Sequence, residues 1–274
     1  MNTHLRKLAV GAAAGSSRRV APRIPLGLVL PAALLLLAEG GVRAGVIPAN
    51  LLPAPSEIAR TLAYLAQHGL ASHVGSSTLR VMFGFAAGAS LAVLLGAAVA
   101  LNRRTEALLD PSFQALRATP SLAWVPLLLL WFGIDETPKL VLIALGAFFP
   151  VYMGVVSGMR GVDRKLIEVA QLYQLGRVAL VRRVLLPAAL PALMTGLRNG
   201  LSLAWMFMVA AELIAASQGL GYLLSDGRET SRADIVLAAI VLLALLGKAS
   251  DSLMLALENR LLSWRDSYGN RGAA

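Results

Sequence analysis

Residues 168–187 read EVAQLYQLGRVALVRRVLLP, and they lie between two long apolar runs. An acidic residue and a small residue come first, basic residues follow, and Leu186-Pro187 closes the segment where the next apolar run begins. In a chain as apolar as this one, a polar segment of this length with an amphipathic start is typical of a surface that meets a soluble partner. The segment therefore indicates a membrane-embedded chain that works together with another polypeptide.

The composition excludes an ordinary soluble domain. Of the 274 residues, 57% are hydrophobic and 15% are charged, whereas charged residues make up about a quarter of a typical soluble domain. The net charge of +10 could suit nucleic acid, but basic residues in so apolar a chain belong to cytoplasmic loops, and no nucleic-acid partner is expected. With no cysteine, and no histidine cluster beyond the pair His68 and His73, no metal site is expected either. A multi-pass membrane protein is the class that remains.

Six apolar segments predict an all-α transmembrane bundle of about six spans. They cover residues 25–44, 80–101, 113–133, 138–159, 190–216 and 234–257. About 20 residues at 1.5 Å each match a hydrocarbon core about 30 Å thick. Prolines, Glu39 and two glycines interrupt the first segment, and Pro120 and Pro126 interrupt the third. We therefore expect the third segment to be a kinked or short span that packs inside the protein.

The segments also divide the chain into parts. These are a basic arm (1–24), the first span (25–44), an external stretch (45–79), a core (80–257) that contains a polar loop (160–189), and a tail (258–274). The external stretch predicts a turn followed by a short amphipathic helix over residues 58–65.

Lysine and arginine positions predict the orientation. If the amino terminus lies in the cytoplasm, eighteen of the 25 lysines and arginines fall on the cytoplasmic side, and Lys248 lies within a span. The six on the outside are Arg43, Arg60, Arg80, Lys139, Arg228 and Arg232. Because cytoplasmic loops carry the excess of positive charge, we expect both termini and the polar loop in the cytoplasm.

No catalytic motif appears in the sequence. The phosphate-loop pattern G-x-x-x-x-G-K-[ST] is missing, since residues 247–250 (GKAS) lack the upstream glycine. The patterns G-x-S-x-G and H-E-x-x-H are missing as well. We therefore expect a chain that is not an enzyme by itself, hydrolyses no ATP and carries no cofactor.

The polar loop begins with a predicted amphipathic helix. Asp163 is placed to cap a helix that starts near Arg164, and Glu168 falls within its first turns. An apolar stripe at i, i+3 and i+4 is formed by Val169, Leu172 and Tyr173. Such a stripe packs against the chain's own spans, enters a groove on a partner, or lies on the lipid surface.

Two further residues of the loop have a steric role. Ala170 is small and permits close approach of another backbone. Pro187 suits the first turn of the following helix, because its missing N–H would have no intrahelical partner there.

The polar loop resembles the cytoplasmic loop of importer-type ABC transporter permeases, which docks on the ATPase subunit. The family pattern is Glu-Ala-Ala, three residues, Gly, nine residues and Ile-x-Leu-Pro. The residues that match it, with Val169 and Val184 as tolerated variants, are Glu168, Ala170, Leu186 and Pro187. Gln174 occupies the glycine position, and the nearest glycine is Gly176. The turn is therefore either displaced or made by a non-glycine residue at a conformational cost.

The resemblance covers roughly residues 50–265 and narrows to the sulfonate/nitrate/taurine branch, most like an aliphatic sulfonate permease. It is carried by residues 110–111, 116–120, 123–127, 130–134, 148–150, 190–191, 195–198, 211–213 and 219–222. It implies an inner-membrane homodimer with two ATPase subunits and a periplasmic binding protein, working by alternating access. The residues to which it gives an ATPase-coupling role are Glu168, Val169, Ala170, Leu172, Tyr173, Gln174, Gly176, Leu186 and Pro187.

The candidates for lining a substrate pathway are Trp205, Met208 and Glu212. An ionised carboxylate within a span is costly, so Glu212 either contacts a ligand or is hydrogen-bonded to a neighbouring helix. The tryptophans are more typical of membrane-belt or packing residues than of a substrate box.

Other intramembrane charges leave a competing function open. Lys248 and Asp251, at i and i+3, most simply neutralise each other, and Arg198 either snorkels to the inner interface or holds an anion. A secondary transporter acting alone would use Glu212, Lys248 and Asp251 for ion coupling and would need no docking loop. For an ABC permease, the expected solute is a small anion, with aliphatic sulfonate first, taurine or nitrate next, and a thiamine-precursor-like molecule as the alternative.

Overall fold

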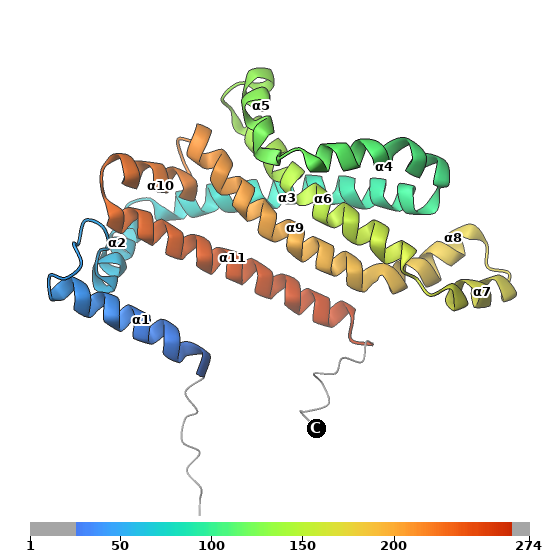
Figure 1. Cartoon of the computed structure of the whole chain (residues 1–274), viewed down its shortest axis with the longest axis horizontal. Helices are drawn as coiled ribbons and strands as arrows, with labels where there is room; N and C mark the ends of the chain where they lie inside the picture. The colour runs from blue at the N-terminus through green and yellow to red at the C-terminus, as the bar shows by residue number, and fades with distance from the viewer. Residues whose placement is uncertain (1–25, 265–274) are drawn as a thin grey trace, which may run out of the picture.

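The computed structural model describes residues 26–264, and this part of the chain is helical without a strand (Figure 1). The elements are α1 (Leu26–Arg43), α2 (Pro55–Gln67), α3 (Leu70–Leu101), α4 (Arg103–Ala118), the 3₁₀ turn η1 (Ser121–Trp124), α5 (Val125–Phe132), α6 (Glu136–Arg160), α7 (Arg164–Leu172), α8 (Arg177–Leu180), the π-helical turn η2 (Val181–Leu185), α9 (Leu186–Ala215), α10 (Leu220–Glu229) and α11 (Ala233–Leu261). The predicted basic arm and the end of the predicted tail lie outside the described residues.

Four long helices are apolar enough to cross a membrane within the described range. They are α3, α6, α9 with the turns that precede it, and α11. Helix α4 and the η1–α5 segment form a broken fifth span, bent by 91°. Helix α1 coincides with the predicted first segment and is 18 residues long. The prediction of an all-α bundle is confirmed, and its count of about six spans is approximate.

Two predicted segments differ from the observed helices. The second begins at Leu70, not at residue 80, because the polar residues from Ser72 to Thr78 hid the first turns of α3. The third breaks near Pro120, whose missing N–H and restricted φ stop α4. The expected kink is present. Helix α4 has no fully buried residue, although Leu109 and Phe113 pack against the core next to α6.

The centre of the protein is a bundle of α3, α6 and α9. Small residues let the backbones approach closely, as in many membrane helix pairs. Gly154 of α6 faces Gly196 of α9, and a Cβ atom on Gly154 would lie 2.9 Å from the Cα of Gly196. Such a contact is too short for any side chain, so the packing of α6 against α9 requires glycine there.

Helices α2 and α11 attach to this bundle through polar contacts. The Thr61 hydroxyl of α2 donates a 2.7 Å hydrogen bond to Asp234 at the start of α11. Along α11, Asp251 and Glu258 accept hydrogen bonds from Arg198 of α9 at 2.9 and 3.3 Å. Lys248 lies 3.9 Å from Asp251 and is largely exposed.

The predicted pair of Lys248 and Asp251 is present, and the structure adds a closer partner for Asp251. Asp251 is neutralised mainly by Arg198 of another helix, because that guanidinium approaches it more closely than Lys248 does. Arg198 does not remain available for an anion in this structure, since two carboxylates of α11 engage its guanidinium.

We predict that Gly154→Ala destabilises the fold by about 1–3 kcal/mol, the usual cost of overpacking a close contact. The matched control is Gly247→Ala on α11, where an added Cβ meets no atom within 4 Å. The control should be neutral or slightly stabilising, because alanine favours a helix. Thermal unfolding of both purified variants in detergent measures the difference, and equal midpoints would contradict the packing assignment.

Candidate functional site

The first candidate site is α7, at the end of the molecule where α6 leads into α8 (Figure 1). Asp163 caps this helix, because its carboxylate accepts a 2.9 Å hydrogen bond from the Lys165 backbone N–H. Arg164 and Glu168 form an i, i+4 ion pair at 3.1 Å on the exposed face. The predicted helix and its cap are confirmed.

One side of α7 faces the protein and the other faces outward. Ala170 is only 3% exposed, whereas Leu172 and Tyr173 are 82% and 78% exposed. Val169 is about half exposed. The predicted stripe is therefore real, and within the described chain its last two residues pack against nothing.

Gln174 makes the turn after α7 in the position where the family pattern has glycine. Its φ is +52°, in the left-handed region that favours glycine. The Gln174 N–H donates to the Gln171 carbonyl at 2.9 Å, and the Leu175 N–H donates to the Ala170 carbonyl at 3.1 Å. These two bonds form a Schellman cap, so the turn is not displaced to Gly176. Of the two alternatives, a turn made by a non-glycine residue is the one observed.

Pro187 lies in the first turn of α9, as predicted, and α9 continues directly from the elements before it. Helix α8, the π-helical turn η2 and α9 follow one another without a break. The Leu186 N–H bonds to the Val181 carbonyl, an i→i−5 bond. A π turn at this point widens the helix just before the proline ring, where the regular i→i−4 bond is absent. The chain after the α7 turn is therefore one continuous helix from α8 into α9.

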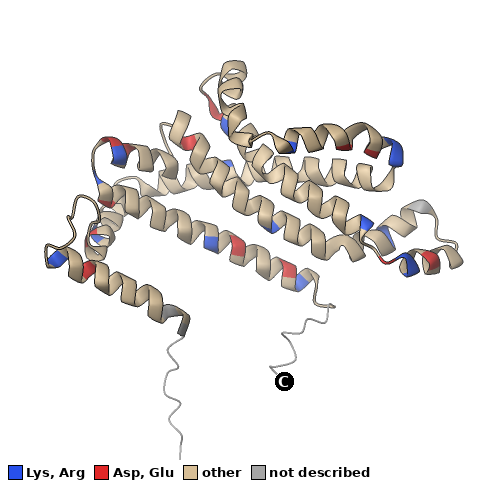
Figure 2. Cartoon of the chain, in the orientation of Figure 1, with Lys and Arg blue, Asp and Glu red and all other residues tan. Residues whose placement is uncertain are grey.

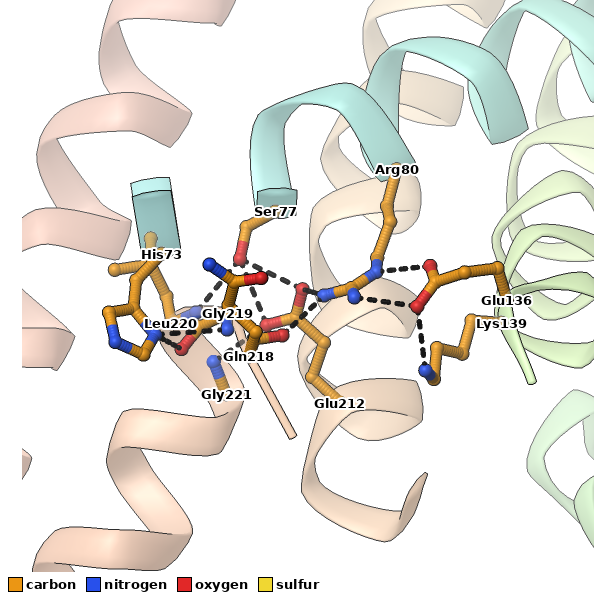
Figure 3. A network of polar contacts seen from close by, with 10 residues as sticks. All are labelled: His73, Ser77, Arg80, Glu136, Lys139, Glu212, Gln218, Gly219, Leu220 and Gly221. Carbon is orange, nitrogen blue, oxygen red and sulfur yellow. Dashed lines mark hydrogen bonds and ion pairs between the residues drawn. The ribbon is translucent and has the colours of Figure 1, made fainter. Parts of the chain in front are cut away.

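The second candidate site is a polar network at the other end of α9 (Figure 3). The network consists of His73, Ser77, Arg80, Glu136, Lys139, Glu212, Gln218, Gly219, Leu220 and Gly221. At its centre, the fully buried Glu212 carboxylate accepts hydrogen bonds from Ser77 at 2.8 Å, from Arg80 at 2.7 Å and from the Gly221 N–H at 2.8 Å. Both carboxylate oxygens of Glu212 are thus occupied.

Arg80 links this centre to α6. Its guanidinium donates to the Glu136 carboxylate at 2.6 and 2.8 Å and to the Gln218 carbonyl at 2.6 Å. Lys139 completes the set at 2.9 Å from Glu136. Two cations and two carboxylates therefore neutralise one another, which offsets much of the cost of burying Arg80, Lys139 and Glu212, while Glu136 is half exposed.

Sequence reasoning missed this network. Arg80 and Lys139 are predicted on external loops, but both side chains are buried, Arg80 within α3 and Lys139 in the first turn of α6. Only residue spacing could have indicated the network. Ser77 and Arg80 are three residues apart, as are Glu136 and Lys139, so each pair lies on one helix face. The partner helices are distant in sequence, and spacing alone does not reveal them.

The three pathway candidates lie along one face of α9, and that face is packed. Met208 is fully buried beside Val81 and Ile143, and the Trp205 ring nitrogen donates a 3.0 Å hydrogen bond to Ser250. The contacts of Glu212 match its structural alternative, a carboxylate bonded to neighbouring helices. No common cavity brings these three side chains together among the hollows found in the described chain. No cluster of metal ligands occurs in the same part of the chain.

Comparison with known proteins decides the family. Residues 81–263 match the family described as binding-protein-dependent transport system inner membrane component. This chain is a member of that family. It is therefore a multi-pass inner-membrane subunit of a binding-protein-dependent transport system, and members of this family are permease subunits rather than enzymes.

Individual relatives support the assignment. The chain is 44% identical, over 88% of both proteins, to a Bacillus subtilis protein named as aliphatic sulfonates transport permease protein SsuC. It is 36% identical to the taurine transport system permease protein TauC of Escherichia coli, over 78% of this chain and 80% of that protein. Its fold resembles a chain of the methionine ABC transporter MetNI in an inward-facing form, with a TM-score of 0.57 at 20% identity. That match covers 73% of this chain and 98% of the other.

We predict that Gln174→Gly stabilises the protein by about 1 kcal/mol, because glycine removes the steric cost of the left-handed conformation. Gln171→Gly is the matched control, since residue 171 is helical and glycine there should cost about 1 kcal/mol. Thermal unfolding in detergent measures both changes. A loss of stability in Gln174→Gly would contradict the turn geometry.

We predict that Glu212→Leu destabilises the protein by about 3–5 kcal/mol, because it leaves the Arg80 guanidinium buried beside a missing partner. The double variant Arg80→Met, Glu212→Leu should recover part of that loss. Glu229→Leu is the control, since Glu229 is exposed and lies 3.8 Å from Arg228. The control should change stability by less than about 0.5 kcal/mol. Additive losses in the double variant would argue against a coupled pair.

Proposed function

We propose that this chain is the membrane-spanning permease subunit of an ABC importer for a small anionic solute, driven by ATP hydrolysis on a separate subunit. Aliphatic sulfonate is the leading substrate, with taurine or nitrate next. Support comes from the family match and from two relatives whose names specify sulfonates and taurine. Both names point to the same headgroup, because taurine is itself an aminoalkyl sulfonate.

Helix α7 is proposed to dock on the ATPase subunit. The observation that carries this role is the contrast between buried Ala170 and the exposed Leu172 and Tyr173. Ala170 lets the helix sit close to its own chain, while the two larger residues present an apolar surface outward. A groove on a soluble partner would bury that surface. Glu168 supports the helix through its ion pair with Arg164, and Pro187 with Leu186 belongs to the continuous connection into α9.

The α7 end of the molecule is proposed to face the cytoplasm, together with both termini. Basic residues gather around α7 and the neighbouring start of α4, as Figure 2 shows in blue. They include Arg103, Arg104, Arg160, Arg164 and Lys165. Positive charge is retained on the cytoplasmic side of membrane proteins, so this gathering supports the orientation. The polar network around Glu212 would then lie toward the periplasm.

The complete transporter is proposed to contain two copies of this chain, two ATPase subunits and a periplasmic binding protein. Substrate delivered from outside would cross between the two permease copies as α7 and α9 move together. The competing secondary transporter receives no support from the charges it requires. Glu212 is saturated by hydrogen bonds, and Asp251 is paired with Arg198.

The test of docking is Tyr173→Asp, which places a charge on the exposed surface of α7. We expect co-purification with the ATPase subunit of the same transporter to fall by about tenfold or more, because an isolated charge in an apolar groove is costly. Tyr64→Asp is the matched control, an exposed tyrosine on α2 at the other end of the molecule. It should keep the ATPase subunit bound.

Both variants should accumulate in membranes at the wild-type level. Unchanged co-purification and unchanged ATP-dependent uptake in Tyr173→Asp would exclude α7 as the docking helix.

A further inference from the structure

Two hollows lie side by side between the α4–η1 segment and the central helices α6 and α9. The first has a volume of about 250 Å³ and is lined by α4 and α6. The second, of about 400 Å³, is lined by η1, α6 and α9. Arg117, in the last turn of α4, lines both of them, as do Phe149 and Met153 of α6. Arg117 therefore stands where the two hollows meet.

Arg117 differs from the other charged groups around these hollows. Arg160 is paired with Glu106 at 2.8 Å. Asp110 accepts hydrogen bonds from Gln114 at 2.7 Å and from Tyr152 at 3.1 Å. No carboxylate among residues 26–264 pairs with Arg117. Among the charged residues that line these hollows, Arg117 is therefore the one without a counter-ion in the described chain.

Arg117 is exposed in the single chain, at the level of the middle of α6, where an unpaired charge is costly in a bilayer. The hollows are lined by Gly146, Phe149 and Met153, which lie near the middle of the 25-residue helix α6. At 1.5 Å per residue, residues 149–153 lie about 10–17 Å from the end of that helix at Arg160. An arginine that faced lipid at this depth would be strongly unfavourable, so its side chain must meet water, a partner or a ligand. The sequence pattern places Arg117 among the charges of a cytoplasmic loop, whereas the structure places it beside the middle of α6.

The second hollow has the chemistry of an amphiphilic anion. Arg117 and Ser121 supply a planar cation and a hydroxyl at one side, and both can donate to an oxyanion. Leu203, Met206 and Phe207 of α9 supply an apolar wall, together with Phe149. A volume of about 400 Å³ falls in the range of small-molecule sites. A sulfonate group with a short alkyl chain fits both parts.

We propose that Arg117 and Ser121 bind the sulfonate group of an aliphatic sulfonate on the translocation pathway, with its alkyl chain against Leu203, Met206 and Phe207. This assignment rests on the proposed function and names the site through which the substrate passes. It also explains why one arginine at mid-membrane depth lacks a carboxylate, since the passing substrate supplies the negative charge.

Transport by the complete transporter in proteoliposomes tests the site. Arg117→Ala should lower ATP-dependent uptake of ethanesulfonate by about tenfold or more, the usual effect of losing a charged hydrogen-bond partner. Arg117→Lys should retain part of the uptake, because it keeps the charge. Arg104→Ala, at the other end of α4, is the matched control and should transport as the wild type does. If the Arg117→Ala transporter takes up ethanesulfonate at the wild-type rate, Arg117 does not bind the substrate and the proposed site is wrong.

Chain-length selectivity tests the apolar wall independently of Arg117. Met206→Trp narrows the second hollow, so it should lower hexanesulfonate uptake relative to methanesulfonate by about tenfold. Leu245→Trp, on an exposed face of α11, is the control and should leave that ratio unchanged. An unchanged ratio in Met206→Trp would overturn the assignment of the alkyl chain.

Labelling separates binding from assembly. The chain contains no cysteine, so Ser121→Cys introduces a single thiol. We expect ethanesulfonate to slow its reaction with a sulfonate-bearing thiosulfonate reagent by at least about threefold, and Arg117→Ala to abolish this protection. If Arg117→Ala instead causes the two permease copies to dissociate, Arg117 belongs to a contact between subunits, and the proposed sulfonate site is wrong. If the wild-type transporter carries nitrate but no sulfonate, the proposed substrate itself is wrong.

Discussion

The ion pair between Arg80 and Glu212 is the constraint on which the arrangement of the central helices depends. Because a bilayer offers no water to buried charges, each must find its partner within the protein. Arg80 comes from α3, Glu212 from α9 and Glu136 from α6, so one guanidinium joins all three central helices. Glu212 also accepts the Gly221 N–H, which fixes the start of α10. A shift of any one of these helices would leave a buried charge unpaired.

The two ends of α9 therefore have opposite properties. At one end, Glu212 is held by four hydrogen bonds and the helix is tied to its neighbours. At the other, α9 continues through the π turn into α8, next to the protruding helix α7. A π turn beside Pro187 is a local weakness in the helix ladder, and bends concentrate at such points. Force applied at α7 is thus expected to move the near half of α9 more than the half anchored at Glu212.

The sequence predicted those features that depend on local pattern. Long apolar runs located the spans, Asp163 signalled the cap of α7, and the glycine pattern marked Gln174 as the place where the turn is either displaced or made by a non-glycine residue. The start of α3 was missed because the polar residues there looked like a loop, whereas they are helical and Ser77 bonds to Glu212 of α9. The polar network was missed because Arg80 and Glu212 are 132 residues apart, and no local rule pairs them. The exposed apolar stripe of α7 was predictable from one helix, whereas the partners of the buried charges required the tertiary fold.

Charge counting treats all arginines alike, but the structure separates them by their partners. Arg164 is neutralised within its own helix, and Arg80 and Arg198 are neutralised by carboxylates of other helices. These three have local or structural roles because a protein group satisfies each of them. Arg117 sits at similar depth to apolar residues of α6 and has no such group in the described chain. In the anion importer that we propose, Arg117 has no carboxylate partner within the described chain and is therefore the residue where the substrate would bind.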